Sequence, residues 1–157
     1  MSVFIATSQD GFIADKDGGV EWLNACKCNP KEGEDTGVSF EAFFGSIDAI
    51  VMGRKTFHSV LSLSKPIGEY DWVYGTKPLR VLSRNTSLVI PKYLHEQVQY
   101  TSDSPEQVVR ELKEQHGVKD FYVDGGNTIK SFLEANLITR LIITRVPVTL
   151  GEGVPLF

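Results

Sequence analysis

The stretch Phe121-Tyr122-Val123-Asp124-Gly125-Gly126-Asn127-Thr128-Ile129 decides the fold that we expect for this chain. An apolar, β-type run ends in two glycines, and a helix-compatible segment begins at once. The start of a helix leaves backbone N–H groups unpaired and carries partial positive charge, so it attracts anions. Glycine lets a phosphate approach the backbone closely. The stretch therefore predicts a strand, a phosphate-binding turn and a helix.

A second turn of the same kind lies at Ile50-Val51-Met52-Gly53-Arg54-Lys55-Thr56-Phe57. Arg54 and Lys55 stand where the helix would begin, and cations there are unfavourable unless an anion compensates them. Two such turns in one small domain indicate a single extended ligand that carries several phosphates. A dinucleotide fits that description.

Composition and length indicate one domain over residues 1–157, because 157 residues suffice for one core but are few for two. The net charge of −4 argues against bulk binding of nucleic acid or of an acidic membrane surface. No apolar stretch approaches the ~20 residues that span a bilayer. The chain enters a strand directly, without a basic leader, so we expect a cytoplasmic protein.

Cys26 and Cys28 are the only cysteines, and a single residue separates them. Zinc sites usually show two residues between paired cysteines and a second pair elsewhere, whereas the three histidines of this chain are scattered. We therefore expect two free thiols and no metal.

Apolar runs and turn residues alternate along the chain. They predict strands at 3–7, 48–52, 79–83, 98–100, 120–123 and 138–148, helices at 39–44, 55–61, 104–117 and 128–135, a mobile loop at 26–37, and a surface loop at 65–78 with a weak strand at 72–74. Helices that alternate with buried strands predict a three-layer α/β fold, with a mostly parallel central sheet between flanking helices. In such sheets, ligands gather where strands end and helices begin.

Four separated segments carry a resemblance to a known family. They are Ile5-Ala6-Thr7-Ser8-Gln9-Asp10-Gly11-Phe12-Ile13-Ala14, Val51-Met52-Gly53-Arg54-Lys55-Thr56-Phe57, Val81-Leu82-Ser83-Arg84 and Val123-Asp124-Gly125-Gly126-Asn127-Thr128. With them the chain resembles the dihydrofolate-reductase-like fold and, within it, the reductase domains of riboflavin biosynthesis (the RibD C-terminal-like family). Each segment alone is a weak signal, but four in order across nearly the whole chain are specific.

The resemblance implies an NADPH-dependent oxidoreductase that reduces a small heterocyclic or carbonyl substrate, similar to 5-amino-6-(5-phosphoribosylamino)uracil reductase. The family would place its cofactor against Ala6, Gly53, Arg54, Lys55, Thr56, Ser83, Arg84, Gly125, Gly126, Asn127 and Thr128. Arg54, Ser83 and Arg84 would meet the adenosine 2′-phosphate. Guanidinium groups suit this dianion, which agrees with the resemblance.

The catalytic residue stays open at this point. Glu41 and Asp10 are the candidates. Glu41 lies near the place of the folate-reductase acid, but the match is not clean, which counts against authentic dihydrofolate reduction. Asp10 either holds substrate or caps its turn. Trp22 and Phe44 are further candidates for substrate contact, although large aromatic residues line cores as often as ligand clefts.

Two alternatives remain, a nucleotide-binding module without turnover and an authentic dihydrofolate reductase. Domains of this fold close their sheet with a C-terminal hairpin after a segment like Gly151–Phe157, where this chain stops, so we expect a domain without that hairpin. The apolar strand at 138–148 is then an edge that invites pairing with a second copy, although Pro147 blunts it. We therefore expect a homodimer that binds a small-molecule substrate.

Overall fold

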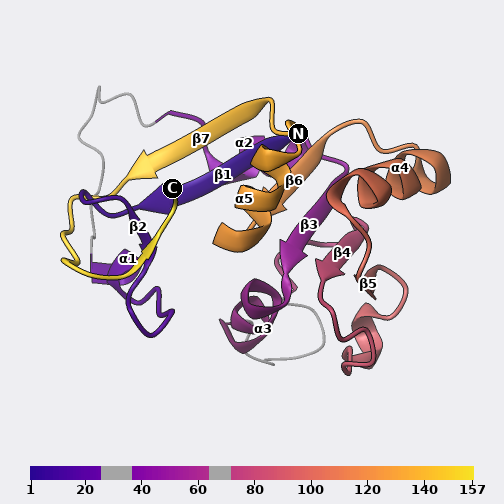
Figure 1. The fold of residues 1–157 in the computed structure, drawn as a ribbon, viewed down its shortest axis with the longest axis horizontal. Coiled ribbons are helices and arrows are strands. Elements are labelled where there is room, and N and C mark those ends of the chain that lie inside the picture. The colour runs from indigo at the N-terminus through magenta and orange to yellow at the C-terminus, as the bar shows by residue number, and fades with distance from the viewer. Residues whose placement is uncertain (26–36, 64–71) are drawn as a thin grey trace.

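A parallel six-stranded sheet forms the centre of the computed structural model, which describes residues 1–25, 37–63 and 72–157. Its strands stand in the order β5-β4-β3-β6-β1-β7, and all neighbouring pairs are parallel (Figure 1). They are β1 (Ser2–Thr7), β3 (Ala49–Gly53), β4 (Leu79–Leu82), β5 (Val98–Thr101), β6 (Phe121–Asp124) and β7 (Arg140–Arg145). A separate antiparallel ribbon joins β2 (Phe12–Ala14) to β8 (Val154–Pro155).

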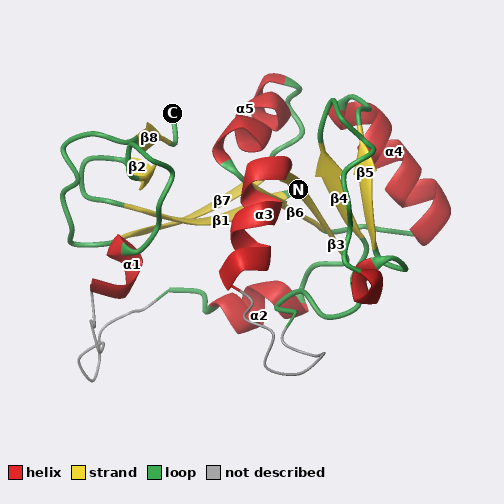
Figure 2. Cartoon of the chain, turned by 90° about the horizontal axis from the view of Figure 1, so that it is seen from below, coloured by secondary structure: helices red, strands yellow, loops and turns green. Residues whose placement is uncertain are grey.

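Helices cover both faces of the sheet (Figure 2). Among the described residues they are α1 (Trp22–Ala25), α2 (Phe40–Gly45), α3 (Arg54–Leu63), α4 (Pro105–His116) and α5 (Gly126–Glu134), with a 3-10 helix, η1, at Lys92–Leu94. Phe43 of α2 and Phe57 of α3 belong to the core on one face, and Leu112 of α4 and Ile129 of α5 to the core on the other. The predicted three-layer α/β fold is therefore confirmed.

Helix α4 shows how local sequence sets these boundaries. Ser104 accepts a hydrogen bond from the Gln107 backbone, and the Gln107 side chain accepts one from the Ser104 backbone, which makes a capping box. Pro105 follows as the first helical residue, and Gly117 ends the helix in the left-handed region at a φ of 62°. Start and end both agree with the sequence prediction.

Two of the predicted segments differ in the structure, and the short elements α1, η1 and β8 were not predicted. Trp72 to Tyr74 form a turn instead of a weak strand, because the Gly75 N–H donates to the Trp72 carbonyl at 3.2 Å and Gly75 adopts a φ of 55°. The long strand expected at 138–148 is shorter, since pairing with β1 ends at Arg145 and Pro147 has no N–H to continue it. Cys26, Cys28, most of the first predicted loop and residues 65–71 of the second lie outside the described residues.

The predictions about membrane and metal binding are not tested by the structure. No helix in the described part of the chain has the length and apolar character needed to cross a membrane. Within the same residues, no three His, Cys, Asp or Glu side chains lie close enough together to hold a metal ion. The cytoplasmic location, the single-domain boundary and the absence of a metal remain predictions.

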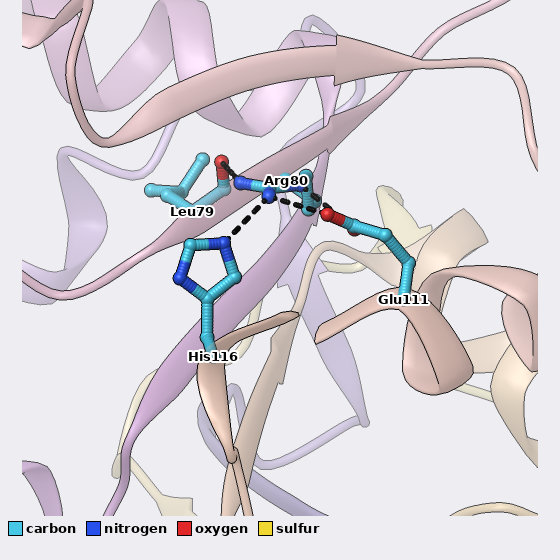
Figure 3. A network of polar contacts seen from close by, with 4 residues as sticks. All are labelled: Leu79, Arg80, Glu111 and His116. Carbon is cyan, nitrogen blue, oxygen red and sulfur yellow. Dashed lines mark hydrogen bonds and ion pairs between the residues drawn. The ribbon is translucent and has the colours of Figure 1, made fainter. Parts of the chain in front are cut away.

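A buried arginine ties β4 to α4 (Figure 3). The guanidinium of Arg80, which is 3% exposed, donates to both carboxylate oxygens of Glu111, from Nε at 3.0 Å and from Nη2 at 2.7 Å. Nη2 also lies 3.3 Å from Nε2 of His116, and Nη1 lies 3.5 Å from the Leu79 carbonyl oxygen. The bidentate ion pair with Glu111 compensates the buried positive charge of Arg80. Without this partner, burial of the guanidinium would cost free energy of folding.

We predict that Glu111→Ala lowers the free energy of unfolding by about 3 kcal/mol, the lower end of the cost of breaking a buried pair, because Arg80 keeps a buried charge without its carboxylate. Urea denaturation measures this loss. The control is Glu152→Ala, since Glu152 pairs with Lys16 at 3.4 Å on the surface and its loss costs at most about 1 kcal/mol. Equal losses in the two variants would contradict the prediction.

Strand β7 lies at one end of the sheet. Among the described residues, no strand pairs with the edge that faces away from β1. Leu141 and Ile143 of β7 are 42% and 41% exposed. The last residues turn back to β2, where Val154 pairs with Ala14, and leave the outer edge of β7 open. The feature that motivated the expected homodimer is therefore present.

We predict that the chain forms a homodimer through β7, because pairing would cover both its open edge and its exposed apolar side chains. Light scattering at micromolar concentration should give twice the chain mass of 17.4 kDa. Ile143→Lys should return the protein to a monomer, whereas Val89→Lys, at a residue 87% exposed elsewhere, should not. A monomeric mass for the parent chain contradicts the prediction.

Candidate functional site

The chain leaves two neighbouring strands in opposite directions. Strands β3 and β6 are paired, with Met52 beside Asp124. After β3 the chain enters α3, which packs on one face of the sheet, and after β6 it enters α5, which packs on the other. Such a divergence opens a crevice at the carboxyl ends of the strands, and α/β sheets bind ligands there. We place the candidate site in this crevice.

The two glycine turns meet at the crevice in a reciprocal contact. A Cβ added to Gly53 would lie 2.9 Å from Oγ1 of Thr128, which is in the first turn of α5. A Cβ added to Gly125 would collide with Oγ1 of Thr56, which is in the first turn of α3. Each threonine thus lies against the glycine of the other turn, and only glycine leaves room for this approach. The sequence predicted that both turns bind one ligand, and in the structure the two turns lie close together.

Both helix starts are suited to an anion. Gly125 adopts a φ of 91°, and among the described residues no side chain caps the first turn of α5. Its first backbone N–H groups are therefore available to a ligand. Neither α3 nor α5 has an acidic residue in its first turn, while Arg54, Lys55 and Asn127 are exposed there. The residues fit the phosphates of a dinucleotide.

The β2–β8 ribbon lies over the start of α5. A Cβ at Gly126 would approach Cδ1 of Ile13 to 2.8 Å and Cγ1 of Val154 to 4.0 Å. Gly126 therefore provides room for this ribbon as well as for a ligand. Ala6 lies near the end of β1, the strand beside β6, and is partly buried.

Arg54, Ser83 and Arg84 lie at the outer part of the same sheet edge. The register aligns Gly53 of β3 with Leu82 of β4, so Arg54 and Ser83 follow directly after neighbouring strands. The Ser83 hydroxyl accepts from the Asn85 backbone at 3.2 Å, and Arg84 is exposed. These three residues flank the region where the resemblance places the adenosine 2′-phosphate.

Asp124 is a crevice residue that the sequence reasoning did not select. It is the last residue of β6, and its carboxylate accepts a hydrogen bond from the Gly125 N–H at 2.8 Å. Burial of the carboxyl group raises its pKa, although the Gly125 N–H and the Tyr122 hydroxyl act in the opposite direction. An acid that ends a buried apolar strand, directly before the glycines, was the signal that could have identified it.

Tyr122 connects Asp124 to the backbone of β1. Burial raises the pKa of Tyr122, so its hydroxyl keeps its proton, and it donates to the Phe4 carbonyl oxygen at 3.2 Å. The Tyr122 hydroxyl also acts on Asp124, whose pKa it lowers against the larger rise caused by burial. The crevice therefore contains a carboxyl group able to hold a proton.

Aromatic rings lie around Tyr122, two residues before Asp124 on β6. Phe40 of α2, which is 38% exposed, stacks on Phe44 at 5.7 Å between ring centroids. Phe44 in turn lies 6.1 Å from Tyr74, and Tyr74 lies 6.4 Å from Tyr122. Flat, partly exposed rings of this kind suit a planar, apolar-faced ligand.

The structure does not bring the other sequence candidates to Asp124. Asp10 accepts from the Ser8 hydroxyl at 2.6 Å and from the Leu150 and Gly151 N–H groups at 3.2 Å and 2.7 Å. The Ser8 hydroxyl, with these N–H groups, lowers the pKa of Asp10 to about 2, so Asp10 is engaged as a cap. Glu41 is exposed, while its neighbour Phe40 stacks inward.

Trp22 is buried, at 8% exposure, and its indole Nε1 has no hydrogen-bond partner among the described residues. The two glycine turns lie together in the structure, with Asp124 at the end of β6, while the phosphate-binding role of the turns and the substrate contacts of Trp22 and Phe44 stay predictions. Geometry and residue types together describe an α/β domain whose two glycine turns are suited to an anionic ligand.

Comparison with known proteins identifies the family. The model of the RibD C-terminal domain matches residues 1–157. The uncharacterized protein YwjB of Bacillus subtilis (strain 168) is 31% identical over 156 residues, which cover 99% of this chain and 80% of YwjB. The chain belongs to the RibD C-terminal domain family.

Solved structures agree with this assignment. A crystal structure from Shewanella sp. PV-4, of a protein whose name provisionally assigns it to riboflavin biosynthesis, has a TM-score of 0.80 and 41% identity, and the match covers 99% of this chain and 81% of that one. The diaminohydroxyphosphoribosylaminopyrimidine deaminase/5-amino-6-(5-phosphoribosylamino)uracil reductase of Thermotoga maritima has a TM-score of 0.66 at 18% identity, over 99% of this chain and 47% of that longer chain. The second likeness shows the dihydrofolate-reductase-like fold alone.

We predict that Asp124→Asn raises the free energy of unfolding at pH 8. Because burial raises the pKa of Asp124, the folded protein binds more protons than the unfolded chain between the unfolded pKa, about 3.9, and the folded value. The stability contribution of Asp124 is therefore fully present below the unfolded pKa and is lost as pH rises through the folded one. Asparagine keeps the Gly125 hydrogen bond and avoids this loss.

Urea denaturation of parent and variant at pH 8 and pH 4 measures the effect, and the gain should shrink toward pH 4. Asp17→Asn, in an exposed turn, is the matched control and should change stability little at either pH. A variant less stable than the parent at pH 8 would contradict a raised pKa at Asp124.

Proposed function

We propose that this protein is an NADPH-dependent reductase of a small heterocyclic or carbonyl substrate. The observation that supports the proposal is the crevice between β3 and β6, where two glycine turns meet beside a protonatable Asp124. Phosphate-binding turns alone would fit any nucleotide, but reduction also needs a proton near the acceptor atom. The crevice has residues for both tasks.

Each group of residues has a distinct role in the proposal. Gly53, Thr56, Gly125 and Thr128 hold the pyrophosphate at the starts of α3 and α5. NADPH supplies the hydride when it is bound. The rings of Phe40 and Phe44 orient a planar substrate and exclude water.

Asp124 holds the proton that the reduced atom needs, and Tyr122 keeps the carboxyl group in place. A general acid of this kind contributes typically 10²–10⁴-fold to the rate. Two structures of the same fold are named as reductases, the 5-amino-6-(5-phosphoribosylamino)uracil reductase of Thermotoga maritima and the riboflavin biosynthesis reductase Rib7 of Saccharomyces cerevisiae. A phosphoribosylamino-pyrimidine is therefore the first substrate to test.

A second candidate function is nucleotide binding without turnover. The engaged carboxylate of Asp10 and the exposed position of Glu41 favour it, because Asp10 already accepts backbone hydrogen bonds and Glu41 faces solvent. The same exposure of Glu41 counts against authentic dihydrofolate reduction. The two functions differ in one measurement, the loss of nicotinamide absorbance when substrate is added.

We predict that NADPH binds more tightly than NADH by roughly ten- to a hundredfold, the value of one charge-assisted hydrogen bond at about 1.5–3 kcal/mol. Arg54 and Arg84 motivate the preference, since both can reach a 2′-phosphate. Fluorescence titration with the two nucleotides measures it, and equal dissociation constants would contradict it.

Turnover is tested in the same preparation, with the phosphoribosylamino-pyrimidine, dihydrofolate and a simple carbonyl compound in turn. Asp124→Asn should bind NADPH like the parent and lose about 10²–10⁴-fold in rate. Asp17→Asn should keep both properties. Tight NADPH binding without turnover on any substrate would favour the nucleotide-binding module.

A further inference from the structure

Positive charge is concentrated around α3 and the end of β4. The described stretches 49–63 and 72–95 contain six of the 16 lysines and arginines, two of the three histidines and none of the 20 acidic residues. The rest of the chain therefore has ten lysines and arginines against 20 acids. A positive region in a protein of net charge −4 points to an anionic ligand.

Most of these cations are available to such a ligand. Arg80 is paired with Glu111, and Lys77 donates to the Ile47 carbonyl oxygen. The other four, Arg54, Lys55, Arg84 and Lys92, are exposed. Arg54 and Lys55 open α3, so their charge adds to that of the helix start and is not offset by any acid within the helix.

A histidine and a tyrosine continue this positive region beyond the residues that the family resemblance names. His58 lies one turn after Arg54 on α3, so the two share a helix face. Nε2 of His58 lies 3.2 Å from the hydroxyl of Tyr100 on β5. Arg54 also acts on Tyr100, because its charge lowers the pKa of Tyr100 against a larger rise caused by burial.

The buried ring of Phe57 packs against both His58 and Tyr100. Its centroid lies 5.9 Å from that of Tyr100, at an interplanar angle of 89°, and 6.1 Å from that of His58. Phe57 itself is 0% exposed. The pair is therefore held on a rigid base, while His58 remains exposed.

His58 and Tyr100 lie where one end of an extended ligand would reach if it bound along the strand ends. Register aligns Gly53, Leu82 and Thr101 across β3, β4 and β5, so Tyr100 stands beside the strand ends that Arg54 and Ser83 follow. A phosphate dianion accepts several hydrogen bonds at once, and guanidinium, imidazole and phenol groups can all donate.

We propose that His58 and Tyr100, together with Arg54, recognise the 2′-phosphate of the dinucleotide and thereby determine the preference for NADPH over NADH. The inference rests on the proposed function and adds two specificity-determining residues to it. Binding the phosphate replaces the weak, exposed contact between His58 and Tyr100 with hydrogen bonds to a charged acceptor.

The test separates the 2′-phosphate from the rest of the nucleotide. Calorimetric titration of the whole chain with adenosine 2′,5′-bisphosphate and with adenosine 5′-monophosphate gives the two affinities. His58→Gln and Tyr100→Phe should each weaken binding of the bisphosphate by about tenfold, one hydrogen bond to a charged group, and leave the monophosphate unchanged. His58→Glu should weaken the bisphosphate further, because it adds a like charge.

Two control variants make the same histidine-to-glutamine and tyrosine-to-phenylalanine changes at residues outside the proposed site. His95→Gln changes an exposed histidine that contacts the Ile90 carbonyl oxygen at 2.7 Å, and Tyr93→Phe changes a tyrosine that is 57% exposed. Both should bind the two nucleotides like the parent. The measure is the ratio of the affinity for the bisphosphate to the affinity for the monophosphate. A residue with only a structural role would leave this ratio unchanged, even if both affinities fell.

The outcomes distinguish this inference from the proposed function. If the parent binds neither NADPH nor NADH, both fail. If the parent prefers NADPH but the His58 and Tyr100 variants keep that preference, the inference alone is overturned. Equal weakening of bisphosphate and monophosphate also overturns it, because the two residues would then only support the local structure.

Discussion

The contact between the two glycine turns constrains the rest of the site. Gly53 and Gly125 end neighbouring strands, and the threonine of each following helix lies against the glycine of the other turn. Side chains at either glycine would push the turns apart, because Thr56 and Thr128 occupy the space. Since α3 and α5 then run to opposite faces, their starts converge on one point although their bodies separate. One ligand can therefore use both helix starts at once.

The same arrangement explains why an acid is tolerated beside a phosphate site. Asp124 lies between the turns, where an ionised carboxylate would repel a bound pyrophosphate. Burial raises its pKa and favours the neutral form, and Tyr122 passes the hydrogen bond on to the Phe4 carbonyl oxygen. A bound phosphate would favour the neutral form still more, since a negative charge nearby disfavours ionisation. Binding of the cofactor and retention of the catalytic proton thus support each other in the proposed mechanism.

The sequence predicted most of the fold, and the two glycine turns that it singled out lie together in the structure. Apolar runs that end in glycine are local patterns, so the strands β3 and β6, the helices after them and the phosphate-binding turns could be recognised from neighbouring residues. Asp124 was not selected in the same way, because its raised pKa comes from burial of the carboxyl group, which exists only in the folded chain. Trp72 and Tyr74 misled the strand prediction, since their β propensity is overridden by the turn at Gly75. His58 and Tyr100 are 42 residues apart and carry no joint pattern in the sequence.

The positively charged side chains lie in a different part of the crevice from Asp124 and the aromatic rings. The cations lie at its outer part, on α3 and after β4, while the aromatic rings and Asp124 lie toward β6 and α2. Burial around Asp124 favours its neutral form, and in the proposed function the positive outer part would attract the phosphates. If the charges were mixed, a cation beside Asp124 would favour its ionised form and remove the proton that reduction requires. In the proposed function this separation would suit both tasks, since binding the phosphates uses positive charge, whereas proton donation uses an acid that stays neutral.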